Sequence, residues 1–369
     1  MRWSTSSTPP STPGCAVPEP ILDVRDLTVR FRTRRGIVTA VDGLSFTVAQ
    51  GEVLGIVGES GSGKSVSMMT LMRLIRDPNA SVTGHAYFRG RDLEVRDLLA
   101  LPESEMRGLC GREIAMIFQD PMTSLTPVYT VGWQIAEQVR AHERVTKKAA
   151  LDRAAGMLGE VGIPDPARRI HQYPHEFSGG MRQRVMIAMA LTCNPALLIA
   201  DEPTTALDVT TQAQILDLIR RLQAAHGSSV ILITHDMGVV SEIADRVLVM
   251  YAGRVAEQGP KSAVFHRPQH PYTWGLLSSV PNTRGGRVRR LPVIPGAPPS
   301  PLEIAESCAF GPRCRLRHDA CAVRPALGGT GDHVDACWLP RDDRQQLRLQ
   351  IAQAAVRRDQ PDDLEGATQ

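Results

Sequence analysis

Long apolar runs are missing from this sequence. No uninterrupted stretch of apolar residues approaches the ~18 residues that a helix needs to cross a lipid bilayer. Residues 1–20 are rich in Ser, Thr and Pro and contain no apolar core of the kind found in a signal peptide. These absences predict a cytosolic chain. Residues 1–20 read as a disordered leader or a misassigned start, because they cannot bury enough surface to fold.

The sequence also has little excess of positive over negative charge, and it has few cysteines. The net charge is only +3, and Lys and Arg are scattered along the chain rather than gathered in one block. This distribution argues against binding to nucleic acid or to an anionic membrane surface. Seven cysteines are few for a secreted disulfide scaffold, whereas 42% hydrophobic residues in a chain of 369 is ordinary for a soluble protein of two domains.

A glycine-rich loop is the most informative feature that is present. The segment Gly58–Ser65 fits the pattern G-x-x-x-x-G-K-[ST] and directly follows the apolar run Val53–Val57, which we expect to be a strand. In such a loop backbone N–H groups close around a polyphosphate, Lys64 adds charge on the terminal phosphates, and the Ser65 hydroxyl can reach Mg²⁺. The next helix points its N-terminus at the anion, whereas a glycine-rich turn without a ligand is the alternative. The predicted nucleotide-binding residues are Gly58, Glu59, Ser60, Gly61, Ser62, Gly63, Lys64, Ser65 and Val66.

A pair of carboxylates follows a second predicted strand. Residues 196–200 form an apolar run typical of a buried parallel strand, and Asp201 and Glu202 come directly after it. Asp201 is placed to hold Mg²⁺ through its water shell, whereas Glu202 can orient or deprotonate the attacking water. The plainer interpretation is an acidic strand end that closes a surface loop. Together with the phosphate-binding loop, the pair favours nucleotide hydrolysis.

Four further motifs make the chain similar to a known family. Residues 177–184 resemble the signature motif of the ATP-binding cassette (ABC) ATPases, residues 117–120 their Q-loop, residues 206–208 their D-loop, and residues 231–236 the segment with their switch histidine. With the phosphate-binding loop and the acidic strand end, these motifs follow the family's order and spacing across residues 21 to about 260. The matching residues are Gln119 of the Q-loop, Ser178, Gly179, Gly180 and Met181 of the signature, Asp208 of the D-loop and the switch residue His235.

The resemblance implies a head-to-tail pair of cassettes. In this family each signature closes on ATP that is held by the phosphate-binding loop of the other cassette, so that ATP binding drives closure and hydrolysis releases it. The residues agree with this arrangement, because Ser178 and two glycines at a helix start offer a hydroxyl, amides and a dipole to an anion. Lys64 already serves the chain's own phosphate site. A second cassette is therefore an expected partner.

The resemblance also assigns roles around ATP. His235 is expected to contact the γ-phosphate, although a lone histidine is more often an ordinary half-buried residue. Gln119 can touch Mg²⁺ or the water, and it begins the segment that contacts the membrane partner. Phe31, in the first predicted strand, can stack on adenine, and packing into a small antiparallel sheet is the alternative. The implied catalytic residues are Glu202, His235 and Gln119, and the implied Mg²⁺ ligands are Ser65, Gln119 and Asp201.

The order of predicted elements indicates an α/β fold. We expect antiparallel strands within residues 21–50 and core strands that alternate with helices, as a mostly parallel sheet requires. The resemblance makes residues 21–260 a P-loop ABC cassette with an antiparallel β subdomain and a helical subdomain at 120–180. A small irregular extension at 261–340 and a charged tail at 341–369 complete the chain. The core strands are predicted at 196–200, 230–234 and 246–250, and the subdomain helices at 131–143 and 147–161.

The C-terminal part resembles a narrower group. The segment His270–Leu277 leads into a proline-rich linker at 292–301, and both are similar to the C-terminal extension of the ATPases of oligopeptide and dipeptide importers. The segment Phe118–Leu125 is typical of the same group. Met181 and the segment Asp201–Asp208 are similar to the first of the two ATPases that such importers use. Thr126 departs from the usual Asn at its position, which concerns partner contact rather than ATP chemistry.

Four cysteines lie close together in this extension. Four thiolates can close a tetrahedral zinc site or hold a [4Fe–4S] cluster, and disulfides are disfavoured in the reducing cytosol. The spacing C-x₅-C-x₆-C-x₁₅-C lacks tight C-x₂-C pairs, so the spacing leaves iron–sulfur, zinc and free thiols open. The resemblance favours a [4Fe–4S] cluster, because the extension of this importer group is associated with one. The predicted ligands are Cys308, Cys314, Cys321 and Cys337.

Taken together, the residues and the resemblance predict an ATP-hydrolysing subunit of a peptide importer. The expected cofactors are ATP and Mg²⁺, and the expected location is the cytoplasmic side of the cell membrane. The expected partners are a second ABC ATPase, two transmembrane permease subunits and an extracytoplasmic substrate-binding protein. Relatives with similar ATPases carry nickel, glutathione or other small solutes, which leaves the cargo open.

Functions outside transport fit the sequence less well. A DNA-repair cassette would need long heptad insertions between the nucleotide motifs, and a translation-type cassette would need two cassettes in one chain. Neither feature is present in this sequence. A nucleic-acid-binding module in the tail is disfavoured by the lack of a basic patch.

Overall fold

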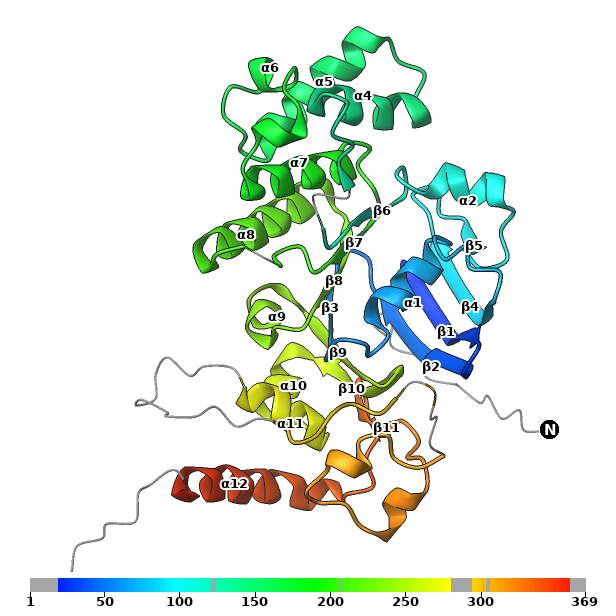
Figure 1. The fold of residues 1–369 in the computed structure, drawn as a ribbon, viewed down its shortest axis with the longest axis vertical. Helices are drawn as coiled ribbons and strands as arrows, with labels where there is room; N and C mark the ends of the chain where they lie inside the picture. Colours follow the sequence, from blue (N-terminus) through cyan, green and yellow to red (C-terminus); the bar gives the residue numbers. More distant parts are fainter. Residues whose placement is uncertain are drawn as a thin grey trace, which may run out of the picture.

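The molecule is built around an eight-stranded core sheet, with a smaller antiparallel sheet, a group of helices and a C-terminal lobe around it (Figure 1). The computed structural model describes residues 19–120, 124–205, 207–279, 294–300, 302 and 306–358, with side chains up to residue 351. The predicted leader up to residue 18, the start of the predicted linker at Pro292 and residues 359–369 of the predicted tail lie outside the described residues.

The core sheet contains the parallel strands that the sequence predicts. Its order is β11-β12-β10-β9-β3-β8-β7-β6, in which β9, β3, β8, β7 and β6 run parallel and β10 runs antiparallel to β9. Every residue of β3, β7 and β8 is buried, because both faces of the sheet are covered. The carboxyl ends of the parallel strands meet at one edge. The bounds are β3 (Val53–Val57), β6 (Ile114–Ile117), β7 (Leu197–Asp201), β8 (Ser229–Thr234), β9 (Arg246–Tyr251) and β10 (Arg254–Pro260).

Alternate residues of the core strands face two different hydrophobic clusters. In β8, Val230 and Leu232 join one cluster, whereas Ile231 and Ile233 join the other. The first cluster includes residues of helices α7 (Gly179–Leu191), α8 (Val209–His226) and α9 (Met237–Ile243). The second includes residues of α1 (Lys64–Leu71) and of the antiparallel sheet. The helix after the phosphate-binding loop and the helix after the signature motif therefore lie on opposite faces of the core sheet.

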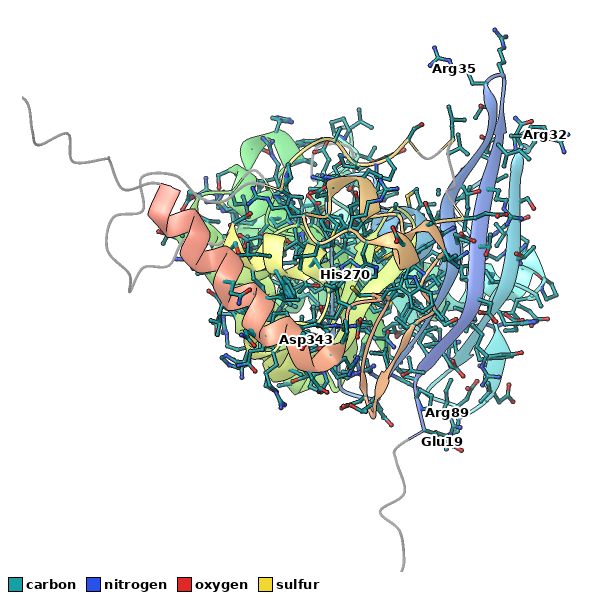
Figure 2. The ribbon with its side chains drawn as sticks, turned by 90° about the horizontal axis from the view of Figure 1, so that it is seen from below. Glu19, Arg32, Arg35, Arg89, His270 and Asp343 are labelled. Atoms are coloured by element: carbon teal, nitrogen blue, oxygen red, sulfur yellow. The ribbon has the colours of Figure 1, made fainter. Side chains whose placement is uncertain are left out.

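The predicted antiparallel strands at 21–50 form a second sheet with the order β2-β1-β4-β5. The long hairpin of β1 and β2 carries Arg32 and Arg35 near its tip (Figure 2). At the opposite end of the sheet, an ion pair between Glu19 and Arg89 ties the start of the described chain to β4. The bounds are β1 (Leu22–Thr33), β2 (Gly36–Val48), β4 (Ala80–Arg89), β5 (Val95–Asp97) and the following helix α2 (Glu103–Leu109).

The predicted helical subdomain is also present. Two of its helices begin where Thr130 and Thr146 cap them by accepting hydrogen bonds from the N–H groups of Trp133 and Ala149. Both helices end one residue earlier than the sequence predicts. The elements are α4 (Val131–His142), α5 (Lys147–Glu160), α6 (Pro166–Arg169), the short 3₁₀ helix η1 (Pro174–Glu176) and α7.

The C-terminal extension is irregular, as predicted, but part of it joins the core. Its strand β12 pairs with β10, so β11 and β12 extend the core sheet at one side. Asp335 of β12 is buried and accepts hydrogen bonds from Arg341 and Arg344, which fixes the start of α12. Thus the charged tail begins as a helix. The elements are α10 (Lys261–His266), α11 (Pro271–Ser278), η2 (Gly311–Arg313), η3 (Asp319–Ala322), β11 (Gly328–Thr330), β12 (His333–Asp335) and α12 (Arg341–Arg358).

Candidate active site

The phosphate-binding loop leaves the carboxyl end of β3, where the sequence places it. Gly58 and Gly63 have positive φ angles of 156° and 96°. A Cβ at these positions would collide with the backbone carbonyl oxygens of Met250 and Ala40, respectively. Glycine is the residue that accepts this backbone without strain. The loop shape therefore depends on these two positions.

Lys64 is folded back onto its own loop. Its Nζ donates hydrogen bonds to the carbonyl oxygens of Gly58 (2.7 Å) and Glu59 (3.0 Å). Burial lowers the pKa of Lys64, although nearby carboxylates act in the opposite direction. An anionic phosphate beside this ammonium would favour its charged form, which is the role that the sequence predicts.

The two residues best placed to hold Mg²⁺ touch each other. Ser65 Oγ donates a hydrogen bond of 2.9 Å to Asp201 Oδ1, and Asp201 is the last residue of β7. Burial raises the pKa of Asp201, whereas a cation at this point would favour its charged form. Hydroxyl and carboxylate oxygens are the hard ligands that Mg²⁺ prefers. The donor set therefore fits the predicted metal.

Glu202 lies at the centre of the predicted catalytic residues. Gln119 Nε2 donates a hydrogen bond of 3.2 Å to Glu202 Oε2, and His235 Nδ1 lies 3.2 Å from Glu202 Oε1. Thr205 Oγ1 donates a further bond of 2.8 Å to Oε2. The structure thus brings Gln119, Glu202 and His235 together from three different loops. Thr205 was not assigned a role from the sequence, although its spacing three residues after Glu202 in the same turn is the signal that could have found it.

The sheet explains why these residues meet. Gln119 follows β6, Glu202 follows β7 and His235 follows β8, which are parallel strands with their carboxyl ends at one edge. Glu202 has a φ angle of 47°, which is unusual for a residue other than glycine. Its N–H donates to the carbonyl oxygen of Ile233 (2.9 Å), and this bond holds the turn against β8.

The signature residues do not belong to this cluster. Ser178 caps α7 by accepting a hydrogen bond from the N–H of Met181 (3.4 Å). Ser178 and Gly179 are exposed, and α7 packs on the face of the core sheet opposite to α1. No described contact joins the signature to the phosphate-binding loop of the same chain. The N-terminus of α7 is therefore open to an anion that another molecule would bring.

Three other predicted nucleotide-site residues have structural contacts of their own. Asp208 caps α8 by accepting hydrogen bonds from the N–H (2.9 Å) and Oγ1 (2.7 Å) of Thr211, and these bonds lower its pKa. Phe31 is half-buried in β1, and like Val66 in α1 it packs against the hydrophobic cluster beneath the antiparallel sheet. Its packing is compatible with either of the roles that the sequence suggests.

The four cysteines of the extension are neighbours, but they do not form a metal site in the described residues. The Cys308 N–H donates a hydrogen bond of 3.0 Å to the carbonyl oxygen of Cys321. Burial raises the pKa of the Cys308 and Cys314 thiols, and it raises the pKa of Cys337 to about 11. Within the part of the chain that the structure describes, no three His, Cys, Asp or Glu side chains are placed to hold a metal ion. The geometry therefore lends no support to the predicted cluster.

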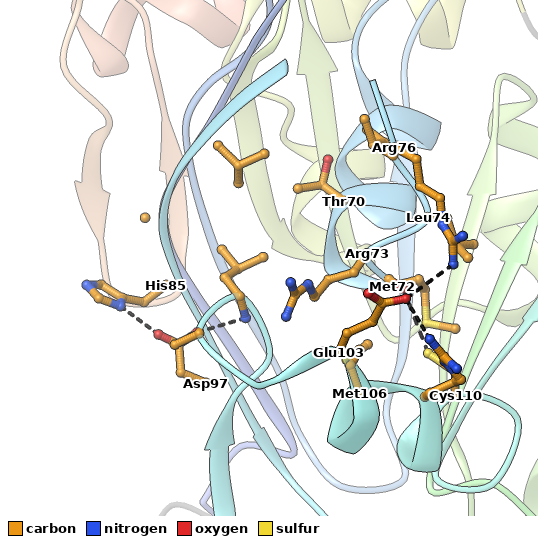
Figure 3. A pocket seen from close by; sticks show the side chains of 16 residues that line it. Thr70, Met72, Arg73, Leu74, Arg76, His85, Asp97, Glu103, Met106 and Cys110 are labelled. Atoms are coloured by element: carbon orange, nitrogen blue, oxygen red, sulfur yellow. Dashed lines mark hydrogen bonds and ion pairs between the residues drawn. The ribbon is translucent and has the colours of Figure 1, made fainter. Parts of the chain in front are cut away.

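A large cavity lies away from the catalytic residues. It has a volume of about 620 Å³ and begins at Thr70, near the end of α1 that points away from the phosphate-binding loop (Figure 3). Among the residues that line it, Glu103 and Arg107 form an ion pair of 2.8 Å one turn apart on α2, and His85 Nδ1 lies 2.8 Å from Asp97. None of the predicted ATP-site residues lines this cavity, so its size does not mark the active site.

The described helices include none long and apolar enough to pass through a membrane. Residues 41–205 match the family described as ABC transporter, and residues 256–321 match the family described as oligopeptide/dipeptide transporter, C-terminal region. Both matches agree with the resemblance seen in the motifs.

Curated relatives are similar over most of their length. A probable peptide ABC transporter ATP-binding protein of Sinorhizobium fredii is 53% identical, over 86% of this chain and 94% of that protein. The dipeptide transport ATP-binding protein DppD of Bacillus subtilis is 51% identical, over 87% and 95%. The oligopeptide transport ATP-binding protein OppD of Haemophilus influenzae is 48% identical, over 87% and 97%.

A solved structure shares the fold of the cassette. It is the dimeric ATP-binding cassette MJ0796 in a post-hydrolysis state, bound to ADP and Pi, with a TM-score of 0.57 and 26% identity. The similarity covers 65% of this chain and 98% of that one. A cassette of this fold therefore accounts for 65% of the present chain.

Proposed function

Since this chain belongs to the ABC transporter ATPases, we propose that it hydrolyses ATP to power the import of peptides across the cytoplasmic membrane. ATPase activity follows from the family itself. Peptide as cargo is supported by the C-terminal region at residues 256–321 and by relatives that are named as peptide, dipeptide and oligopeptide transport proteins.

One observation carries the proposed chemistry. The carboxylate of Glu202 is held between Gln119 and His235, next to the Ser65–Asp201 pair and the phosphate-binding loop. We assign Glu202 to orienting or deprotonating the attacking water and His235 to the γ-phosphate. Bound Mg²⁺ would neutralise charge on the phosphates, and Ser65, Asp201 and Gln119 would hold it.

A second cassette is the proposed partner in hydrolysis. The support is that the signature at the start of α7 is exposed, and that α7 and α1, the helix that follows the phosphate-binding loop, pack on opposite faces of one sheet. We propose a heterodimer of related cassettes, bound to two transmembrane permease subunits at the cytoplasmic side of the membrane. An extracytoplasmic substrate-binding protein would deliver the cargo.

Two finer assignments belong to the same proposal. Residues 21–260 act as the cassette, residues 261–340 as the transporter extension and residues 341–369 as a tail. Cys308, Cys314, Cys321 and Cys337 bind a [4Fe–4S] cluster of structural function, with Zn²⁺ as the alternative. The support for a cluster is the chemistry of four thiols gathered in a short irregular segment.

Transport by the reconstituted complex tests the proposal. The chain is purified with two permeases and a second cassette, placed in lipid vesicles and supplied with a binding protein, ATP and labelled di- and tripeptides. Peptide accumulation that depends on ATP is the expected result. Accumulation of Ni²⁺ or glutathione without peptide would keep the ATPase and change the cargo, whereas co-purification of nucleic acid without permeases would contradict a transport role.

A further inference from the structure

The C-terminal extension contacts the phosphate-binding loop at Glu59. The guanidinium of Arg313, in η2, donates to both carboxylate oxygens of Glu59: Nη1 to Oε2 at 2.7 Å and Nη2 to Oε1 at 3.1 Å. The two residues are separated by 254 positions in the sequence. Such a two-point contact fixes the direction of the carboxylate as well as its distance.

A second contact from the extension holds the backbone of the same residue. The N–H of Glu59 donates a hydrogen bond of 2.8 Å to Tyr272 Oη, and Tyr272 lies in α11. The carbonyl oxygen of Glu59 accepts from Lys64 Nζ, as described above. Glu59 is thus held through its side chain, its N–H and its carbonyl group, and two of the three contacts come from outside the cassette.

Arg313 itself is rigidly supported. Its Nε donates to the carbonyl oxygen of Pro295 (2.9 Å), its Nη1 lies 3.3 Å from the hydroxyl of Tyr251, and its guanidinium lies 5.8 Å from the centre of the Tyr251 ring. Tyr251 packs against Tyr272 and Phe310, which closes an aromatic cluster under the loop. Only 8% of Arg313 is exposed, whereas 26% of the Glu59 side chain is exposed, so the pair is partly shielded from solvent.

The pairing of Glu59 with Arg313 should affect ATP binding, because Glu59 lies in the phosphate-binding loop. Glu59 is a carboxylate within a loop that binds a polyanion, and its charge is felt by Lys64 of the same loop. An unpaired carboxylate there would repel the phosphates, and a loop without its outer contacts would lose part of its preformed shape. The extension also borders the loop directly: a cavity of about 240 Å³ is lined by residues 60–62 on one side and by Pro298, Pro299 and Ser300 on the other.

We propose that Arg313 is a positioning residue for ATP binding, which holds and neutralises Glu59 so that the C-terminal extension preorganises the phosphate-binding loop. The inference rests on the proposed ATP-binding function of that loop. It predicts a change in nucleotide affinity rather than in the chemical step, because no contact within the described residues joins Arg313 to Gln119, Glu202 or His235.

Equilibrium binding of a fluorescent ATP analogue with Mg²⁺ to the isolated full chain tests this role. Arg313→Met should weaken binding by about 10-fold, the size expected for losing a buried charge-assisted pair. Arg315→Met, two residues further along, removes an exposed cation and should leave affinity unchanged. Arg313→Lys keeps the charge without the two-point geometry, so its affinity for the ATP analogue should lie between those of Arg313→Met and the wild type.

A double-mutant comparison separates this role from a merely structural one. In a Glu59→Gln background there is no carboxylate to neutralise, so Arg313→Met should change ATP affinity much less than it does in the wild type. Affinity unchanged by Arg313→Met, or an equal loss in both backgrounds, would overturn the inference. A wild-type chain that binds no ATP would instead show that the proposed function is wrong. If Arg313→Met does not fold, Arg313→Lys and Glu59→Gln carry the same comparison.

In the assembled transporter Arg313→Met should raise the KM for ATP and leave kcat nearly unchanged. A fall in kcat at constant KM would contradict a role in binding and so overturn the assignment.

Discussion

The catalytic edge of the core sheet and the C-terminal extension position their polar residues by different means. At the edge, Gln119, Glu202 and His235 each follow a parallel strand, so the hydrogen bonds of the sheet set their spacing. In the extension, Arg313 is placed by its side-chain contact with the distant Glu59, and His270 by the hydrogen bond that its N–H donates to the Glu257 side chain of β10. Substitutions at the edge should therefore impair chemistry and spare stability, whereas substitutions in the extension should first affect binding or stability.

The largest effect is expected at Glu202. The Glu202→Gln variant keeps the size of the side chain and much of its hydrogen bonding but removes the base. ATP turnover by the assembled complex should fall by on the order of 10²–10⁴, the usual contribution of a general base. ATP should still bind, and the closed pair of cassettes should accumulate. Phosphate release and nucleotide binding measure the two effects separately.

Two variants sharpen this result. Glu242→Gln removes an exposed carboxylate from α9 and should leave turnover unchanged. Lys64→Ala should weaken nucleotide binding itself, because Lys64 belongs to the phosphate-binding loop. Turnover of Glu202→Gln within a few-fold of the wild type would show that another group is the catalytic carboxylate.

The next largest effect on turnover is expected at Ser178 of the signature motif, which lies away from the ATP site of its own chain. Ser178→Arg fills the exposed N-terminus of α7 with a bulky cation, so turnover of the complex should fall by at least on the order of 10². The affinity of the isolated chain for ATP should stay nearly the same. Ala149→Arg adds the same side chain at an exposed position of α5 and serves as the control. A comparable loss of affinity in the lone chain would mean that the signature acts on the ATP of its own chain.

A moderate effect on stability is expected at His270 of the extension. Burial lowers the pKa of His270 to about 4 from the usual 6.5, despite the nearby carboxylates of Glu257 and Asp335. As the pH falls below 6.5, His270 becomes protonated in the unfolded chain. In the folded chain it becomes protonated only near pH 4. The free energy of unfolding should thus fall by up to about 3 kcal/mol as the pH drops through this window.

Chemical denaturation at pH 7, 5.5 and 4 measures this loss. His270→Asn keeps a side-chain acceptor for the Tyr272 N–H but cannot titrate, so its unfolding free energy should depend less on pH. His266→Asn, an exposed histidine in the same extension, should behave like the wild type. Equal pH dependence of His270→Asn and the wild type would show that His270 is not the group responsible.

The smallest effect on turnover is expected at the cysteines. Replacing any one of the four by Ser should release the whole cluster but change ATP turnover only a few-fold, because the expected role is structural. Protein purified without oxygen should be brown, with a broad absorption at about 400 nm and with iron and acid-labile sulfide. Cys193→Ser, outside the extension, should keep the metal.

The metal content decides between the alternatives at this site. Colourless protein with stoichiometric zinc would show that the four cysteines bind zinc instead of an iron–sulfur cluster. Four thiols that can be alkylated in metal-free protein would remove the site altogether. Burial raises the pKa of Cys337 to about 11, so the alkylation rate of Cys337 should keep rising with pH until about pH 11.

Much of the cassette could be predicted because its signals are local. The predicted strand at Val53–Val57 is β3, and the helices of the helical subdomain begin at the capping threonines. The catalytic cluster could be predicted from strand ends, since parallel strands bring their carboxyl ends together. Thr205 received no role, because one hydroxyl in a turn carries little signal until the position of its neighbour is known. The metal prediction rested on cysteine spacing and resemblance, and the described geometry does not assemble the ligands.

By itself the sequence determined the core strands, the helices of the helical subdomain and the motif residues, because hydrophobic periodicity, caps and glycine conformations act over a few residues. Only the tertiary structure decided which distant segments meet. β12 joins the core sheet through β10, and Arg313 reaches Glu59 across 254 positions of the chain. Such contacts depend on the packing of the whole molecule, so no local pattern specifies them. The connection between the extension and the phosphate-binding loop is therefore a property of the fold.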